Sequence, residues 1–127
     1  LQHRLMNSQV NILVVDDDRL IVKTVKRLLE KMDYQVSSAL SAELGLKKLQ
    51  EETYDLILLD LLMPGMDGTK FLESFPKGPD IPVIIMSGQQ DISSKLATFD
   101  LGAVDYITKP FSSAILLARI EAKLRRS

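Results

Sequence analysis

Residues 11–18 read NILVVDDD, a short run of mostly β-branched apolar residues that stops at three consecutive aspartates. An apolar run of this length without polar alternation is typical of a strand buried on both faces of a parallel sheet. After it the pattern changes, and the apolar residues from Ile21 to Met32 recur at helical intervals behind Asp18, a good N-cap residue. We therefore predict a strand over Asn11–Val15 and a helix from Arg19 to about Met32.

The same alternation continues along the rest of the chain. Short apolar runs predict further strands, over residues 35–40, 54–60, 82–86 and 105–108. Helical spacing predicts further helices, over residues 42–52, 69–74, 92–101 and 113–124, with Ser41 and Ser112 as caps of the first and last of these. Five strands alternating with five helices imply βαβ crossovers and helices on both faces of a parallel sheet. We predict an α/β fold: a single doubly wound (βα)5 flavodoxin-like domain with strand order 2-1-3-4-5.

Composition limits the class of protein. The 127 residues fit one domain, and 46% hydrophobic and 26% charged residues are typical of a folded, water-soluble chain. Sixteen Lys and Arg nearly cancel seventeen Asp and Glu, so we expect no direct nucleic-acid or membrane binding by this domain. The absence of cysteine excludes disulfides and zinc–thiolate sites and suits a cytoplasmic location. We interpret residues 1–9, which contain the one histidine, as a leader, tag remnant or linker, and residues 10–127 as the domain.

Polar residues gather where the predicted strands end. These residues are Asp16 and Asp17, Asp60, Ser87 and Lys109. In a doubly wound sheet ligands bind beyond the carboxyl ends of the strands, so we expect these side chains to share one site. Each residue alone has an ordinary interpretation, as a helix cap or a solvated charge. Three crowded carboxylates, however, must shift their pKa values, pair, or bind a cation, and their oxygens suit Mg²⁺.

An aspartate beside a divalent cation can act as a nucleophile toward phosphorus and form an aspartyl phosphate. A lysine and a hydroxyl can then stabilise the charge on the transferring phosphoryl oxygens. Lys109 and Ser87 have the side chains for these two roles. The residues thus indicate phosphoryl-transfer chemistry.

Four segments together resemble the response-regulator receiver domain, over about residues 10–126. They are VVDDD (14–18), LLDLLMPGMDG (58–68), IIMSG (84–88) and GAVDYITKPF (102–111). The resemblance implies a phosphoacceptor domain of a two-component phosphorelay, in which Asp60 receives the phosphoryl group from the phosphohistidine of a histidine kinase or phosphotransfer protein, or from a small acyl phosphate. It implies a signalling domain rather than an enzyme, since such a domain catalyses only its own phosphorylation and dephosphorylation.

The resemblance also implies a metal site. Asp17 would bind Mg²⁺ directly beside Asp60, Asp16 would hold a water of the ion, and Leu62 would offer its backbone carbonyl. Mn²⁺ would be a substitute ion.

The remaining motif positions imply a switch. Ser87 and Tyr106 match the family's two switch positions, and Lys109 matches the lysine that pairs with the phosphoryl group. The bond between Lys109 and Pro110 is cis in the family. Phosphorylation would change the face formed by the helix over residues 92–101, the strand over 105–108 and the last helix, and that face would control an attached output domain or a partner protein, or support a homodimer.

The nature of the output stays open. Receivers joined to winged-helix DNA-binding domains pair through opposite charges on this face, but the matching positions here hold Ala97, Val104 and Ile115. DNA binding is therefore one alternative beside a cyclic-dinucleotide enzyme, a hybrid kinase, a phosphatase output, or no output domain.

Two rival functions use the same residues. A haloacid-dehalogenase-like phosphatase could use Asp16, Asp18, Ser87 and Lys109, but it would need a downstream acidic pair and a cap, and it would leave Asp60 without a role. A degenerate receiver would bind partners independently of phosphorylation, yet such domains usually lack an acidic or lysine position, and all are present here.

Overall fold

The computed structural model describes residues 7–61, 68–74, 81–88 and 105–125. Its strands and helices are β1 (Asn11–Val15), α2 (Arg19–Lys31), β2 (Gln35–Ala39), α3 (Ala42–Glu51), β3 (Leu56–Asp60), α4 (Gly68–Ser74), β4 (Val83–Ser87), β5 (Asp105–Thr108) and α6 (Ser113–Leu124). From β1 to β4 they alternate, as the apolar pattern predicts. The helix predicted over residues 92–101 lies outside the described residues, as do Leu62, Ala97 and Val104.

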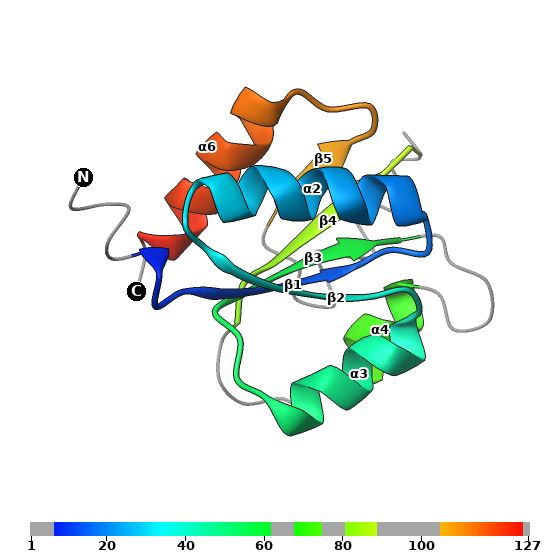
Figure 1. Cartoon of the computed structure of the whole chain (residues 1–127). Coiled ribbons are helices and arrows are strands. Elements are labelled where there is room, and N and C mark those ends of the chain that lie inside the picture. The colour runs from blue at the N-terminus through cyan, green and yellow to red at the C-terminus, as the bar shows by residue number, and fades with distance from the viewer. Residues whose placement is uncertain (1–6, 62–67, 75–80, 89–104, 126–127) are drawn as a thin grey trace.

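The strands form a five-stranded sheet in the order β2-β1-β3-β4-β5, and every neighbouring pair is parallel. Helices α2 and α6 cover one face of the sheet, and α3 and α4 cover the other (Figure 1). This arrangement confirms the predicted α/β fold class and strand order. Because all strands run the same way, their carboxyl ends lie along one edge of the sheet.

The core consists of two apolar layers, one on each face of the sheet. Leu13, Val15 and Leu59 belong to the layer beneath α3 and α4, whereas Val14 and Leu58 belong to the layer beneath α2 and α6. Every residue of β3 and β4 is buried. Burial on both faces explains why these strands show continuous apolar runs instead of alternation.

Two strands begin later than predicted. The strand predicted over residues 54–60 begins at Leu56. Asp55, just before it, is bonded to the start of β1: its N–H donates to Asn11 O at 2.7 Å, and its Oδ2 accepts the N–H of Asn11 at 2.8 Å. The strand predicted over residues 82–86 begins at Val83 and continues to residue 87. Pro82 has no N–H to donate to a ladder.

The predicted N-caps are present. Asp18 Oδ1 accepts the N–H of Leu20 at 2.9 Å, and the Oγ atoms of Ser41 and Ser112 each accept the N–H three residues later at 3.1 Å. Capping satisfies backbone donors that a helix cannot pair internally. In α2 it makes the helix begin directly after the aspartates that follow β1, which holds those aspartates at the edge of the sheet.

Asn7, near the end of the expected leader, contacts the domain. Asn7 Nδ2 donates to Met32 O at 2.8 Å, and Asn7 O accepts the N–H of Val10 at 2.9 Å. The first bond joins the segment before β1 to the end of α2, and the second is local to that segment. No helix in the described part of the chain combines the length and apolarity that a membrane span requires.

Candidate acidic phosphoacceptor site

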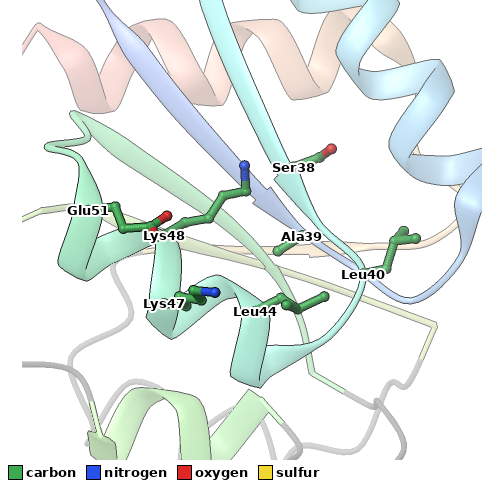
Figure 2. A pocket seen from close by; sticks show the side chains of 7 residues that line it. All are labelled: Ser38, Ala39, Leu40, Leu44, Lys47, Lys48 and Glu51. Atoms are coloured by element: carbon green, nitrogen blue, oxygen red, sulfur yellow. The ribbon is translucent and has the colours of Figure 1, made fainter.

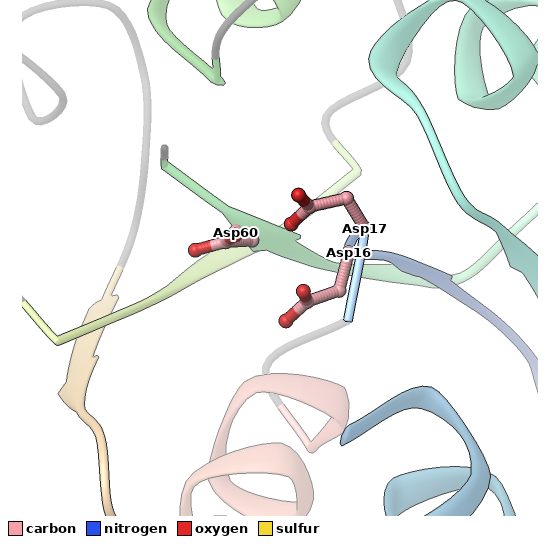
Figure 3. Close-up of side chains that lie close together, drawn as sticks. All are labelled: Asp16, Asp17 and Asp60. Atoms are coloured by element: carbon pink, nitrogen blue, oxygen red, sulfur yellow. The ribbon is translucent and has the colours of Figure 1, made fainter. Parts of the chain in front are cut away.

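Three aspartates meet at the carboxyl edge of the sheet. Asp60 is the last residue of β3, and Asp16 and Asp17 follow β1, the neighbouring strand. One carboxylate oxygen from each residue lies within 4.8 Å of the others (Figure 3). The adjacency of β1 and β3 therefore brings together the carboxylates that the sequence places 43 residues apart, at positions 17 and 60.

The three aspartates differ in their surroundings. The Asp16 side chain is fully buried and Asp60 is 6% exposed, whereas Asp17 is exposed to solvent. Asp16 Oδ1 accepts the N–H of Asp18 at 2.9 Å, a bond made possible by the turn between β1 and α2. The cluster thus has one buried, backbone-bonded carboxylate, one nearly buried carboxylate and one open to incoming ligands.

Lys109 brings a positive charge to the cluster from the end of β5. Its Nζ lies 2.7 Å from Asp16 Oδ2 and 3.5 Å from Asp60 Oδ1. Its backbone N–H donates to Ser87 O at 2.7 Å, which holds the start of the segment after β5 against the end of β4. The Lys109–Pro110 peptide bond is cis, as the family resemblance implied.

The pKa of Lys109 reflects two opposing effects. Burial acts to lower it, but the hydrogen bond to Asp16 and the negative charges of Asp60 and Asp16 act to raise it, and the net pKa lies above its ordinary value. Lys109 is therefore a cation at neutral pH. Three formal carboxylate charges against one ammonium leave two negative charges, an electrostatic setting that favours a divalent cation.

Ser87 and Tyr106 lie on adjacent strands, β4 and β5, two register positions apart, since Tyr106 pairs with Ile85. Ser87 ends β4 and is 1% exposed, and its strand neighbour β3 ends at Asp60, which pairs with Met86. Tyr106 lies in the middle of β5 and is 8% exposed, in the apolar layer beneath α3 and α4. The structure thus places the Ser87 backbone at the same edge as Asp60, and the Tyr106 side chain within the core.

An ion-pair group near the carboxyl end of the chain was not identified from the sequence. Arg119 Nη1 lies 2.7 Å from Asp105 Oδ1, and Lys123 Nζ lies 3.8 Å from Asp105 Oδ2. These contacts join the start of β5 to α6. The four-residue spacing of Arg119 and Lys123 predicts that they share one side of the helix, but the position of Asp105 beneath them depends on how α6 crosses the sheet.

Comparison with known proteins assigns the chain to a family. Residues 12–121 match the family of the response regulator receiver domain. The chain therefore belongs to this family of two-component signalling domains. Two-component signalling implies a histidine kinase as partner, and the acidic cluster of Asp16, Asp17 and Asp60 is typical of the magnesium site of receivers. The phosphatase alternative gains no support from this family assignment.

Similar proteins include the regulatory protein VanRB of Enterococcus faecalis, which is 40% identical over 118 residues, 93% of this chain and 54% of that protein. The response regulator ArlR of Staphylococcus saprophyticus is 40% identical over 115 residues, 91% of this chain and 52% of that protein. The chain thus spans about half the length of these relatives.

Solved structures show the same fold. A CheY-like receiver domain protein from Methanospirillum hungatei JF-1 superposes with a TM-score of 0.88 at 36% identity, covering 91% of this chain and 94% of that one. The BeF3-activated DrrB receiver domain gives a TM-score of 0.84 at 36% identity, covering 92% and 98%. These structures support the CheY-like, doubly wound fold of the described sheet.

Proposed function

We propose that Asp60 accepts a phosphoryl group from the phosphohistidine of a histidine kinase or phosphotransfer protein, or from a small acyl phosphate. The observation that carries this proposal is the position of Asp60, at the end of a fully buried strand, with two further aspartates within 4.8 Å and Lys109 Nζ at 3.5 Å. A carboxylate oxygen of Asp60 forms the new bond to phosphorus while the phosphorus–nitrogen bond to histidine breaks and the imidazole leaves.

The residues that would hold Mg²⁺, or Mn²⁺ in its place, are Asp16, Asp17 and Asp60, with the backbone carbonyl of Leu62, which lies outside the described residues. Their oxygen atoms fit a hard divalent cation. When bound, the ion neutralises negative charge on the phosphoryl oxygens and on the attacking carboxylate. Asp16, which is buried and already bonded to Lys109 and a backbone N–H, would act through a water of the ion.

Lys109 and Ser87 would recognise the phosphoryl group after transfer. Lys109 already carries its charge to within 3.5 Å of Asp60, so a small movement of its ammonium would pair it with a phosphoryl oxygen. Ser87 would donate its hydroxyl to another oxygen from the end of the adjacent strand. With Tyr106 as the second switch residue, these contacts would select one conformer of the face that includes β5 and α6.

We further propose that this receiver, a cytoplasmic module formed by residues 10–127, controls transcription through another domain or a partner. Support comes from relatives about twice its length, among them the transcriptional regulatory protein YvrH of Bacillus subtilis, 40% identical over 121 residues. The near-zero net charge argues against nucleic-acid contact by the receiver itself. Its own phosphorylation and dephosphorylation are its only expected catalysis.

Incubation with acetyl phosphate and Mg²⁺ tests the phosphoacceptor. The chain should acquire a phosphoryl group that hydroxylamine removes, and Asp60→Asn should abolish the labelling because an amide oxygen cannot form the acyl phosphate. Asp33→Asn is the matched control, since residue 33 is an exposed aspartate whose positive φ of 69° asparagine also tolerates. Persistent labelling of the Asp60→Asn variant would refute the proposal.

A further inference from the structure

Strand β2 lies at an edge of the sheet, and its one neighbour in the sheet order is β1. Gln35 donates its N–H to Val10 O at 2.9 Å, and Ala39 O accepts the N–H of Asp16, the residue after β1, at 3.1 Å. These groups therefore point toward β1. Backbone groups of successive strand residues point to opposite sides, so those of Val36 and Ser38 face away from β1. Among the residues that the structure describes, no strand pairs with β2 on that side.

A pocket of about 390 Å³ lies beside this open edge, between β2 and α3 (Figure 2). Its size is in the lower part of the range for specific binding pockets, roughly 300–1,000 Å³. Its walls combine the end of the edge strand with one side of a helix, a shape that suits an extended chain lying along β2. The lining residues that carry the inference are Ser38, Leu40, Leu44, Lys47, Lys48 and Glu51.

The pocket contains apolar surface together with an excess of positive charge. Leu44 is 51% exposed, although leucine in a folded domain is usually covered. Two lysines, Lys47 and Lys48, line the pocket with one carboxylate, that of Glu51. Within the described part of the chain no ion pair joins either lysine to an acidic side chain. In Figure 2 the Lys48 side chain extends from α3 toward the strands. A ligand with carboxylates would complement both lysines.

We propose that the edge of β2 and this pocket form a docking site for an extended, acidic peptide segment of a partner protein. The backbone of the segment pairs with the outward groups of Val36 and Ser38, an apolar side chain covers Leu44, and carboxylates pair with Lys47 and Lys48. A second copy of this chain is a poorer occupant, because β2 has no carboxylate that would pair with Lys47 and Lys48 of the other copy. The pocket shares no residue with the aspartate cluster, and the proposal does not depend on phosphotransfer to Asp60.

Amide-resolved NMR titration of the 127-residue chain tests the proposal, with a synthetic peptide of alternating valine and glutamate residues as the probe. We expect shifts at the amides of Val36, Ser38 and Leu40 and at the lysines of α3. Methylation of every second peptide nitrogen should weaken binding at least about tenfold, since it removes several backbone donors. Combined Lys47→Gln and Lys48→Gln substitution should weaken binding about fivefold.

Two variants make the test specific. Ser38→Pro removes an outward N–H, which an edge strand tolerates, so it should weaken peptide binding about tenfold while Mg²⁺ still shifts the amides around Asp60. Lys23→Gln, at an exposed position on α2, makes the same charge change elsewhere and should leave affinity unaltered.

Three outcomes would overturn the proposal. The first is the absence of shifts at the β2 amides. The second is equal affinity for the methylated and the unmethylated peptide, which would indicate that acidic peptides are attracted to the lysines without backbone pairing. The third is concentration-dependent shifts at β2 without peptide, which would assign the edge to a second copy of the chain.

Discussion

Lys109 Nζ lies 2.7 Å from Asp16 Oδ2 but 3.5 Å from Asp60 Oδ1, so the lysine binds the fully buried aspartate more closely than the proposed phosphoacceptor. In this state Lys109 neutralises a carboxylate that has no contact with solvent. We expect the Lys109 ammonium to move toward Asp60 when a phosphoryl group adds negative charge there.

Substitution of Lys109 should therefore reduce stability as well as phosphoryl chemistry. Lys109→Gln leaves the buried Asp16 without its cation, and we expect the free energy of unfolding to fall by about 1–3 kcal/mol in metal-free buffer. Urea denaturation measures this loss, and added Mg²⁺ should restore part of it. Lys109→Arg keeps the positive charge and should lose less unfolding free energy than Lys109→Gln. An unchanged unfolding midpoint in Lys109→Gln would show that the ion pair with Asp16 contributes nothing.

Metal binding should depend on the exposed aspartate of the cluster. Mg²⁺ at about 100 times its dissociation constant should stabilise the wild-type chain by about 2.7 kcal/mol, since only the folded state assembles the site. Asp17→Asn removes a carboxylate and should diminish this stabilisation, which thermal unfolding with and without Mg²⁺ would measure. Asp33→Asn should respond as the wild type does. Equal Mg²⁺ stabilisation of the Asp17→Asn and wild-type chains would argue against Asp17 as a ligand.

Gly45 in α3 is required by close packing against β1. A Cβ added at Gly45 would lie 2.9 Å from Val15 Cγ2 and 3.1 Å from Phe71 Cε2, and both of these side chains are fully buried. Gly45→Ala gains about 1 kcal/mol of helix propensity but incurs about 1–3 kcal/mol of overpacking, so we expect a net loss of about 1 kcal/mol. In chemical denaturation, Gly88→Ala serves as the control, because a Cβ there has no heavy atom within 4 Å. A stabilised Gly45→Ala variant would contradict this account.

The raised pKa values of two tyrosines, Tyr34 and Tyr54, predict that the protein loses stability at alkaline pH. Burial, and secondarily the charge of Glu121, raises the pKa of Tyr34 above 10.0. Burial also raises the pKa of Tyr54; a hydrogen bond with Ser37 opposes this shift, and the hydrogen bond of the Tyr54 hydroxyl to Glu52, at 3.0 Å, adds to it. The folded state keeps these protons at a pH where the unfolded chain releases them.

The tyrosine contribution to stability is therefore fully present below about pH 10 and is lost as pH rises through the folded-state pKa values. Urea midpoints from about pH 8 to about pH 11 should fall less steeply in Tyr34→Phe than in the wild type. Parallel slopes for the two proteins would exclude a contribution from Tyr34.

Much of the site could be predicted because a parallel sheet brings the ends of its strands to one edge. The apolar runs before Asp16 and Asp60 identify strands without reference to any contact, and their carboxylates must then lie close together. Leu62 lies outside the described residues, and the roles proposed for Tyr106 and Ser87 stay predictions.

Local pattern alone determined the strands, the helix caps and the presence of an acidic cluster with a lysine, because hydrophobic period and capping act over a few residues. Only the tertiary structure decided that Asp16 is buried while Asp17 is exposed, and that Lys109 binds Asp16 more closely than Asp60. These burials and contacts involve residues at the ends of different strands, β1, β3 and β5. They depend on how the strands pack together and how the chain turns after each of them. The same is true of the pocket between the edge of β2 and α3, which no motif in the sequence indicates.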